Sequence, residues 1–163
     1  MSDPSSEASP ELKLVTIYTD GACDPNPGIG GWAAILTHPQ TGKRTEISGA
    51  AADSTNNRME LIAVIEALQR LKNPCRVTLI TDSEYVKNAF TAGWLVGWQA
   101  KGWKTAARKP VKNQDLWMQL IELEKLHDIE WQWVRGHAFN ALNNRCDELA
   151  VEARLKLARQ LRG

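Results

Sequence analysis

Short runs that mix β-branched and apolar residues predict five strands in this chain. The turn residues Pro39 to Gly42 separate the second run from the third, so the first three strands are expected to form an antiparallel meander. The predicted strands cover 12–19, 31–37, 43–49, 76–81 and 129–134.

Apolar residues at helical spacing predict four helices. The first begins at Thr55, a good N-cap, and Asn73-Pro74 stops it after about Lys72. The others are expected at 84–90, capped by Ser83, at 114–126 and at 144–161. Three strands are thus followed by alternating helices and strands, and a strand–helix–strand unit usually places its strands parallel with a right-handed crossover. The fold class predicted is α/β with a mixed sheet.

The length of 163 residues predicts one domain. Residues 1–10 are polar and rich in Ser and Pro, which predicts a disordered tail before a single domain at 11–163. Three widely spaced cysteines indicate reduced thiols and a cytoplasmic protein, and no apolar run is long enough for a membrane span. The net charge of +1 gives no bulk signal for a nucleic-acid partner.

Two acidic residues end strand-like runs of the same build. Asp20 follows Val15–Thr19, and Asp82 follows Val77–Thr81. If these strands are parallel neighbours, both carboxylates emerge at one edge of the sheet and repel each other by roughly 4 kcal/mol at an effective dielectric near 20. Hard divalent cations with oxygen ligands, Mg²⁺ or Mn²⁺, are the natural partners of such a cluster.

Each candidate also has an ordinary structural interpretation. Asp is common in turns, and an acid in the first turn of a helix, as expected for Glu60 and Asp147, interacts well with the helix dipole. Glu60, however, is flanked by Met59 and Leu61 near the buried stripe of its helix. His137 lies on a loop ten residues before Asp147, and loops often carry catalytic groups.

Between Glu84 and Asp115 the chain has no acidic residue but several lysines and tryptophans. In a chain of almost zero net charge, this segment is a localised basic patch suited to phosphates. The alternatives are a solvated face for the lysines and ordinary helix packing for Trp94 and Trp98 at i,i+4 spacing.

Taken together, these residues resemble ribonuclease H of the bacterial type 1 class. The resemblance runs from about Leu12 to Ala153 and rests on the motifs TDGACDPNPGIGGWAAIL, STNNRMEL, TDSEYV, GWKTAARKPVKNQDLW and WVRGHAFNALNNRCDELA. It implies a five-stranded mixed sheet flanked by helices. It also implies a monomeric endonuclease that hydrolyses the RNA strand of an RNA–DNA hybrid with two Mg²⁺ ions, leaving 5′-phosphate and 3′-hydroxyl ends, largely without regard to base sequence.

The resemblance assigns roles position by position. Four acids match the family's metal ligands, and His137 matches its loop histidine. The remaining matches concern the hybrid. The metal ligands implied are Asp20, Glu60, Asp82 and Asp147. Residues implied in minor-groove and 2′-hydroxyl contacts are Cys23, Asn26, Asn56 and Asn57, with Thr55 and Asn113 at a DNA-strand phosphate. The basic protrusion, or handle, implied comprises Trp94, Trp98, Lys101, Lys104, Lys109 and Lys112.

The chain departs from the family pattern at a few places that concern substrate affinity. Glu84 stands where relatives often have Gln at an RNA contact, and Asp53 stands where close relatives can have a basic residue. The handle is less basic than in some members, and the loop 139–144 lacks an acidic residue found in familiar members. Two rival functions remain open: a DNA-acting nuclease of the same superfold and a non-catalytic hybrid-binding module.

Overall fold

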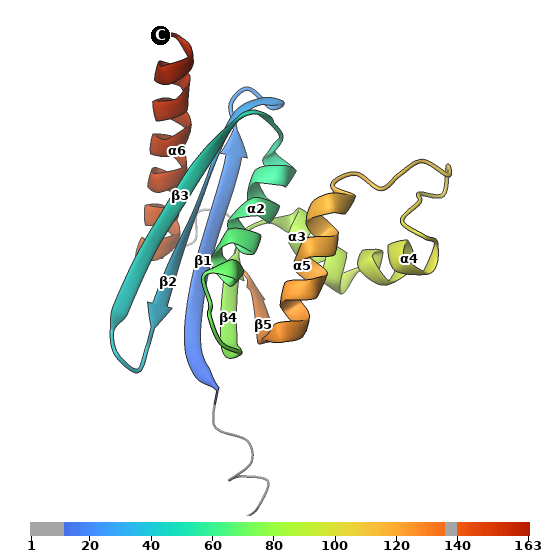
Figure 1. The fold of residues 1–163 in the computed structure, drawn as a ribbon, viewed down its shortest axis with the longest axis horizontal. Coiled ribbons are helices and arrows are strands. Elements are labelled where there is room, and N and C mark those ends of the chain that lie inside the picture. Colours follow the sequence, from blue (N-terminus) through green and yellow to red (C-terminus); the bar gives the residue numbers. More distant parts are fainter. Residues whose placement is uncertain (1–11, 136–139) are drawn as a thin grey trace, which may run out of the picture.

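A computed structural model describes residues 12–135 and 140–163 of the chain. The predicted tail and His137 lie outside these described residues. Figure 1 shows a twisted sheet with helices on both sides and one segment that projects away from the body. The elements are β1 (Lys13–Cys23), β2 (Gly28–His38), β3 (Lys43–Ser54), α2 (Asn56–Gln69), β4 (Cys75–Thr81), α3 (Glu84–Thr91), α4 (Trp94–Ala100), α5 (Gln114–Leu126), β5 (Asp128–Trp133) and α6 (Ala141–Leu161).

The five strands form one mixed sheet in the order β3-β2-β1-β4-β5. Strands β1, β2 and β3 pair antiparallel, while β4 pairs parallel with both β1 and β5. The predicted α/β class, the meander and the parallel pair are therefore confirmed. In the described residues, no helix combines the length and apolar character needed to cross a membrane.

Strand β1 is longer than its sequence pattern indicated. Asp20 was expected to end the strand, which is wrong, because pairing with β2 continues through Cys23 opposite Gly30. The parallel pairing with β4 does stop earlier, at Tyr18 opposite Ile80. Asp20 and Asp82 thus each lie two residues beyond this last pair. Asp20 therefore stands at the end of the β1–β4 ladder while it remains held by β2.

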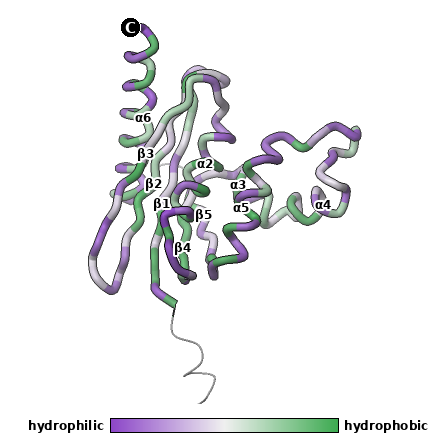
Figure 2. The backbone as a smooth tube through the Cα atoms, in the orientation of Figure 1, coloured by the Kyte–Doolittle hydropathy of each residue, from purple (hydrophilic) through white to green (hydrophobic). Residues whose placement is uncertain are grey.

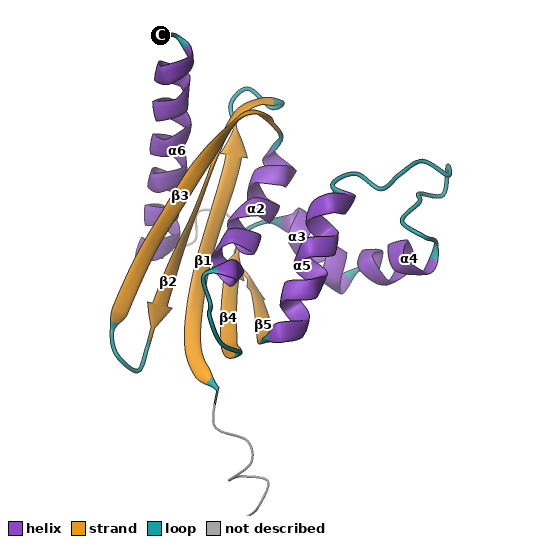
Figure 3. Ribbon diagram, in the orientation of Figure 1, coloured by secondary structure: helices purple, strands orange, loops and turns teal. Residues whose placement is uncertain are grey.

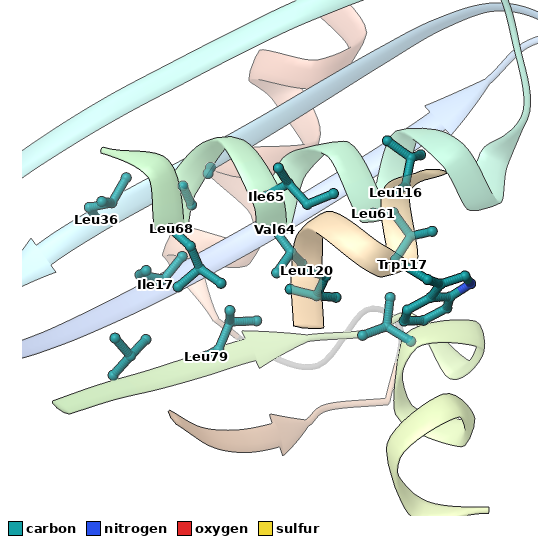
Figure 4. Close-up of a cluster of buried hydrophobic side chains, with 14 of the residues drawn as sticks. Ile17, Leu36, Leu61, Val64, Ile65, Leu68, Leu79, Leu116, Trp117 and Leu120 are labelled. Carbon is teal, nitrogen blue, oxygen red and sulfur yellow. The ribbon is translucent and has the colours of Figure 1, made fainter. Parts of the chain in front are cut away.

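The core lies between the sheet and helices α2, α3 and α5 (Figure 4). Ile17 and Leu79 point from neighbouring strands toward Leu68 of α2, and the fully buried Trp117 of α5 lies at the other end of the cluster, near Leu61 and Leu120. Helix α2 begins as predicted, with the Thr55 side chain accepting a hydrogen bond from the Arg58 N–H. This cap and the buried stripe fix where the first turn of α2 meets the sheet.

Helix α6 covers the opposite face of the sheet, against β1, β2 and β3 (Figure 3). Green and purple alternate along it in Figure 2, as expected of an amphipathic helix. It begins three residues earlier than the predicted Asn144, because the Asn140 side chain accepts hydrogen bonds from the N–H groups of Leu142 and Asn143. Asp147 therefore lies in the second turn rather than opening the helix, and the dipole interpretation does not apply.

The segment between α3 and α5 contains a helix that was not predicted, α4. Together with the loop that follows, it projects from the body (Figure 1). Glycines at its boundaries, Gly93 and Gly102, adopt positive φ angles of 74° and 66° and obscured the helix in the sequence.

Candidate active site

Three acidic side chains from different elements converge where β1 and β4 part. Val15 and Ile17 face the α2 side of the sheet, so Asp20, of opposite parity, faces the α6 side. Asp147 of α6 lies there, and both its carboxyl group and that of Asp82 are close enough to raise the pKa of Asp20. Burial, followed by the charges of Asp82 and Asp147, raises the pKa of Asp20 from 3.8 to about 7.

Glu60 approaches the same place from α2. Its carboxylate accepts a hydrogen bond from the hydroxyl of Ser83, the residue after Asp82. Burial raises the pKa of Glu60 from 4.5 to about 7; Ser83 opposes this shift, and the charge of Asp82 adds to it. Ser83 also caps α3, where its oxygen accepts from the Val86 N–H. One serine thus holds Glu60 and fixes the start of α3 beside Asp82.

A glycine allows α2 to come this close to the strand that carries Asp20. A Cβ at Gly21 would lie 2.6 Å from the Met59 carbonyl oxygen and 2.8 Å from the Glu60 nitrogen. Only a residue without a side chain tolerates that separation. Gly21 therefore sets the distance between Asp20 and Glu60.

The four acids are the predicted metal ligands, and the structure brings them to one edge of the sheet from β1, α2, the β4 end and α6. Within the part of the chain that the structure describes, the groups that shift the pKa of Asp20 or Glu60 include no cation. In residues 12–135 and 140–163, however, no three His, Cys, Asp or Glu side chains are arranged closely enough to form a direct metal cage. Hard carboxylate oxygens are the donor set that suits Mg²⁺ or Mn²⁺.

A polar surface adjoins the acids. The Asn56 side-chain oxygen accepts from the Cys23 N–H at 2.7 Å, and the Asn56 N–H donates to the Asn26 side-chain oxygen at 3.1 Å. These two bonds attach the turn after β1 to the start of α2 and so hold Cys23, Asn26 and Asn56 next to one another. The Cys23 thiol itself is buried with Met59. The polar contacts this surface can offer therefore come from the asparagines and the backbone.

Beside this surface is a pocket of about 590 Å³. It brings together predicted residues from three segments of the chain, including the phosphate candidates Thr55 and Asn113. Its lining consists of Asn26, Pro27, Thr55, Asn56, Asn57, Lys112 and Asn113. Amides, a hydroxyl and one ammonium group at a helix N-terminus form a lining suited to an anion.

The predicted handle is the projecting segment formed by α4 and residues 101–112. Its four candidate lysines, at 101, 104, 109 and 112, are all exposed. The Trp98 ring packs against Trp94, Trp103 and the buried Trp117, with centroid distances of 5.9, 6.4 and 5.8 Å. The packing interpretation of Trp94 and Trp98 is therefore confirmed, and these rings attach the handle to the body.

Sequence reasoning missed several residues that hold the site together. Arg58 binds Asp115 and Asn113, and Tyr85 accepts hydrogen bonds from Asn113 and Trp117. Arg58 lies within a motif already noted, but its partners are too far along the chain for any spacing rule to reveal them. Trp133 was also missed: its indole N–H donates to the Asp82 backbone carbonyl at 3.2 Å. Glu84, a predicted RNA contact, is exposed at the first position of α3.

Comparison with known proteins gives a consistent result. The family described as RNase H matches residues 12–154. The chain is 54% identical to ribonuclease H of Moorella thermoacetica over 149 residues, covering 91% of this chain and 97% of that protein. It is 53% identical to ribonuclease H of Zymomonas mobilis over 154 residues, covering 94% and 97%. Among solved structures, LC9-RNase H1, a type 1 RNase H with the type 2 active-site motif, superposes with a TM-score of 0.80 at 32% identity, covering 91% of this chain and 75% of that one.

Proposed function

Because this chain belongs to the ribonuclease H family, we propose that it is an endonuclease that hydrolyses the RNA strand of RNA–DNA hybrids. The observation that carries the proposal is that four acids, Asp20, Glu60, Asp82 and Asp147, converge beside a polar surface. Asn26 and Asn56 form this surface, which we call the asparagine surface. A site that only bound phosphates would not collect negative charge at its centre. The acid cluster is therefore catalytic, and the asparagine surface reads the substrate.

The four carboxylates would hold divalent metal ions, which the family generally uses; we propose Mg²⁺, with Mn²⁺ as a substitute. When bound, such ions supply an activated water and stabilise the negative charge of the leaving oxygen. Asp20, in contact with Asp147 and facing Asp82, is the candidate shared ligand. Its backbone neighbour Gly21 donates to its Oδ1 at 2.9 Å and orients the carboxylate.

The remaining residues select and hold the substrate. The 2′-hydroxyl distinguishes RNA from DNA. We assign its recognition to the polar groups of Asn26, Asn56 and Asn57, which lie together beside the acids. These contacts reach sugar and backbone, so cleavage is expected to be largely independent of base sequence. Thr55 and Asn113 hold a phosphate of the DNA strand, and the exposed lysines of the handle add electrostatic affinity. Cleavage leaves 5′-phosphate and 3′-hydroxyl ends, with His137 assisting turnover.

We also propose that the protein acts as a monomer in the cytoplasm. Its three cysteines are free and buried, which suits a reducing compartment. The named relatives are bacterial proteins.

The proposal is tested with three matched 20-mer duplexes of one sequence: RNA–DNA, DNA–DNA and RNA–RNA, each incubated with Mg²⁺. Cleavage restricted to the RNA strand of the hybrid is expected. Cleavage of the DNA duplex would favour a DNA-acting nuclease of the same superfold. Tight binding of the hybrid without turnover would favour a binding module.

A further inference from the structure

The Arg58 guanidinium is fixed by hydrogen bonds to two residues at the start of α5. It forms a fork on the Asp115 carboxylate, with NH1 3.1 Å from Oδ1 and NH2 3.0 Å from Oδ2. NH1 also donates to the Asn113 side-chain oxygen at 3.2 Å. Because a two-pronged contact fixes the plane of the guanidinium, Arg58 holds Asn113 at a defined angle. Asp115 compensates the charge of Arg58, so the arginine is not itself a free anion ligand.

This contact decides which way the Asn113 amide faces. Arginine has only donors, so the atom that faces Arg58 must be the amide oxygen. The amide nitrogen then lies on the other side, where it donates one N–H to the Tyr85 hydroxyl at 3.1 Å. The Tyr85 oxygen also accepts from the indole of the fully buried Trp117 at 2.9 Å. Both ends of the amide are therefore fixed. Arg58, which is bound to Asp115, holds the oxygen, and Tyr85, which is bound to Trp117, holds the nitrogen.

One N–H of Asn113 remains for a ligand in the pocket that it lines with Thr55 and Lys112. The Asn113 backbone is left-handed, with φ 63° and ψ 23°, a conformation that asparagine tolerates better than most residues. The Thr55 oxygen already accepts the Arg58 backbone N–H, so its hydroxyl hydrogen is left to donate. Asn113 and Thr55 thus each present a donor to the pocket, as a phosphate oxygen requires.

We propose that Arg58 is a positioning residue for the DNA strand of the substrate: it turns the Asn113 amide so that its N–H, rather than its oxygen, faces the phosphate pocket. The proposal rests on the function proposed above. Arg58 contacts no reacting atom. It acts through Asn113 and therefore governs the affinity for the hybrid rather than the chemical step.

A double-mutant cycle tests this dependence on Asn113. Arg58→Met and Asn113→Ala should each raise KM for the hybrid about tenfold, equivalent to about 1.4 kcal/mol, with kcat changed less than about twofold. If Arg58 acts through Asn113, the double variant should show no more than either single change. Independent effects that multiply to about a hundredfold, or a loss confined to kcat, would overturn the proposal.

Three further variants separate orientation from charge and from general destabilisation. Arg58→Lys keeps the charge but lacks the fork, so it should behave like Arg58→Met; restoration of KM would overturn the proposal. It also replaces Arg58→Met in the cycle should that variant not fold. Asn113→Asp keeps the shape and the Arg58 contact but has no N–H, so its KM should rise at least as much as that of Asn113→Ala, and an unchanged KM contradicts the proposal. Arg76→Met removes a comparable exposed pair, Arg76 with Asp128 at 3.1 Å, and should leave KM unchanged.

The substrate offers an independent readout. In a series of hybrids, one DNA-strand phosphate at a time is replaced by a neutral methylphosphonate. The wild-type protein should lose affinity at one such position, and Arg58→Met should lose that sensitivity; undiminished sensitivity would overturn the proposal. If the wild-type protein does not cleave the hybrid at all, the proposed function fails. The same cycle, measured as hybrid binding in EDTA by fluorescence anisotropy, still decides the role of Arg58.

Discussion

Replacing Asp20 by Asn should stabilise the metal-free protein at neutral and alkaline pH while it abolishes cleavage. The change keeps the side-chain shape and the Oδ1 that accepts from Gly21, but it removes a charge that burial and two neighbouring acids make unfavourable. The pKa of Asp20 rises from 3.8 to about 7 on folding. At 1.36 kcal/mol per pH unit this corresponds to roughly 4 kcal/mol. Since Asp82 is exposed and solvent screens its charge, we expect a gain of roughly 1–4 kcal/mol.

The pH dependence has a defined sign. Between pH 4 and pH 7 the folded protein retains a proton on Asp20 that the unfolded chain has released, so the free energy of unfolding of the wild type falls as pH rises through this window. Asp20→Asn lacks this contribution. The two proteins should be equally stable near pH 4 and diverge up to about pH 7. Glu60, with its own pKa raised to about 7, leaves a residual slope in the variant.

The assay is urea denaturation in EDTA at pH 4, 5.5, 7 and 8, with unfolding followed by circular dichroism. Asp53→Asn, at an exposed position on β3, is the matched control and should follow the wild type at every pH. Added Mg²⁺ should stabilise the wild type more than Asp20→Asn, because only the wild type retains the full ligand set. An Asp20→Asn variant no more stable than the wild type at pH 8 would refute the electrostatic account of the acid cluster.

Three other predictions concern separate parts of the molecule. His137→Ala should lower kcat by roughly 10²–10⁴-fold at saturating hybrid with metal affinity unchanged, as a general acid–base role implies, whereas His38→Ala should match the wild type; a fast His137→Ala variant would make this histidine structural. The triple change of Lys101, Lys104 and Lys109 to Ala should raise KM and reduce the slope of log K against log salt by about 0.9 for each phosphate that the lysines no longer neutralise, and an unchanged KM and slope would show that these lysines only face solvent. Gly31→Ala should destabilise the fold by about 2–3 kcal/mol in urea denaturation, because its Cβ would overlap the Ala150 carbonyl oxygen of α6. Gly97→Ala, with open space at its Cβ, should be neutral or stabilising by up to about 1 kcal/mol, so equal losses in the two glycine variants would contradict this view of α6 packing.

The sequence predicted best what depends on local chemistry and strand parity. Thr55 caps α2 as expected, and the matched positions of Asp20 and Asp82 relative to their strands survive as matched positions beyond the last β1–β4 pair. The end of β1 was misjudged because it depends on a partner: residues 21–23 remain extended by pairing with β2. The start of α6 was also misjudged. Because Asn140 rather than a residue near Asn144 caps the helix, Asp147 lies in its second turn.

The network around Arg58 lay beyond sequence reasoning for a different physical reason. Arg58 and Asp115 are 57 residues apart, and they meet only because α2 and α5 pack on the same face of the sheet. Charge, size and spacing give no hint of such a pair before the helices are placed. In the same way, the sequence showed a Trp-rich basic stretch but not that Trp98 packs on Trp117. Packing therefore explains part of a pattern that first indicated substrate binding.

The central claim is that acids gathered from four elements hold metal ions that cleave RNA within a hybrid. Its most direct test is product analysis on a 5′-end-labelled RNA strand annealed to DNA, with wild type and Asp82→Asn side by side, in Mg²⁺ and in EDTA. The account predicts shortened RNA with 3′-hydroxyl ends, extendable by a polymerase, only for the wild type in Mg²⁺. Asp82→Asn should leave the RNA intact although it still binds the hybrid. Cleavage by the wild type in EDTA, or near-normal cleavage by Asp82→Asn in Mg²⁺, would contradict the account.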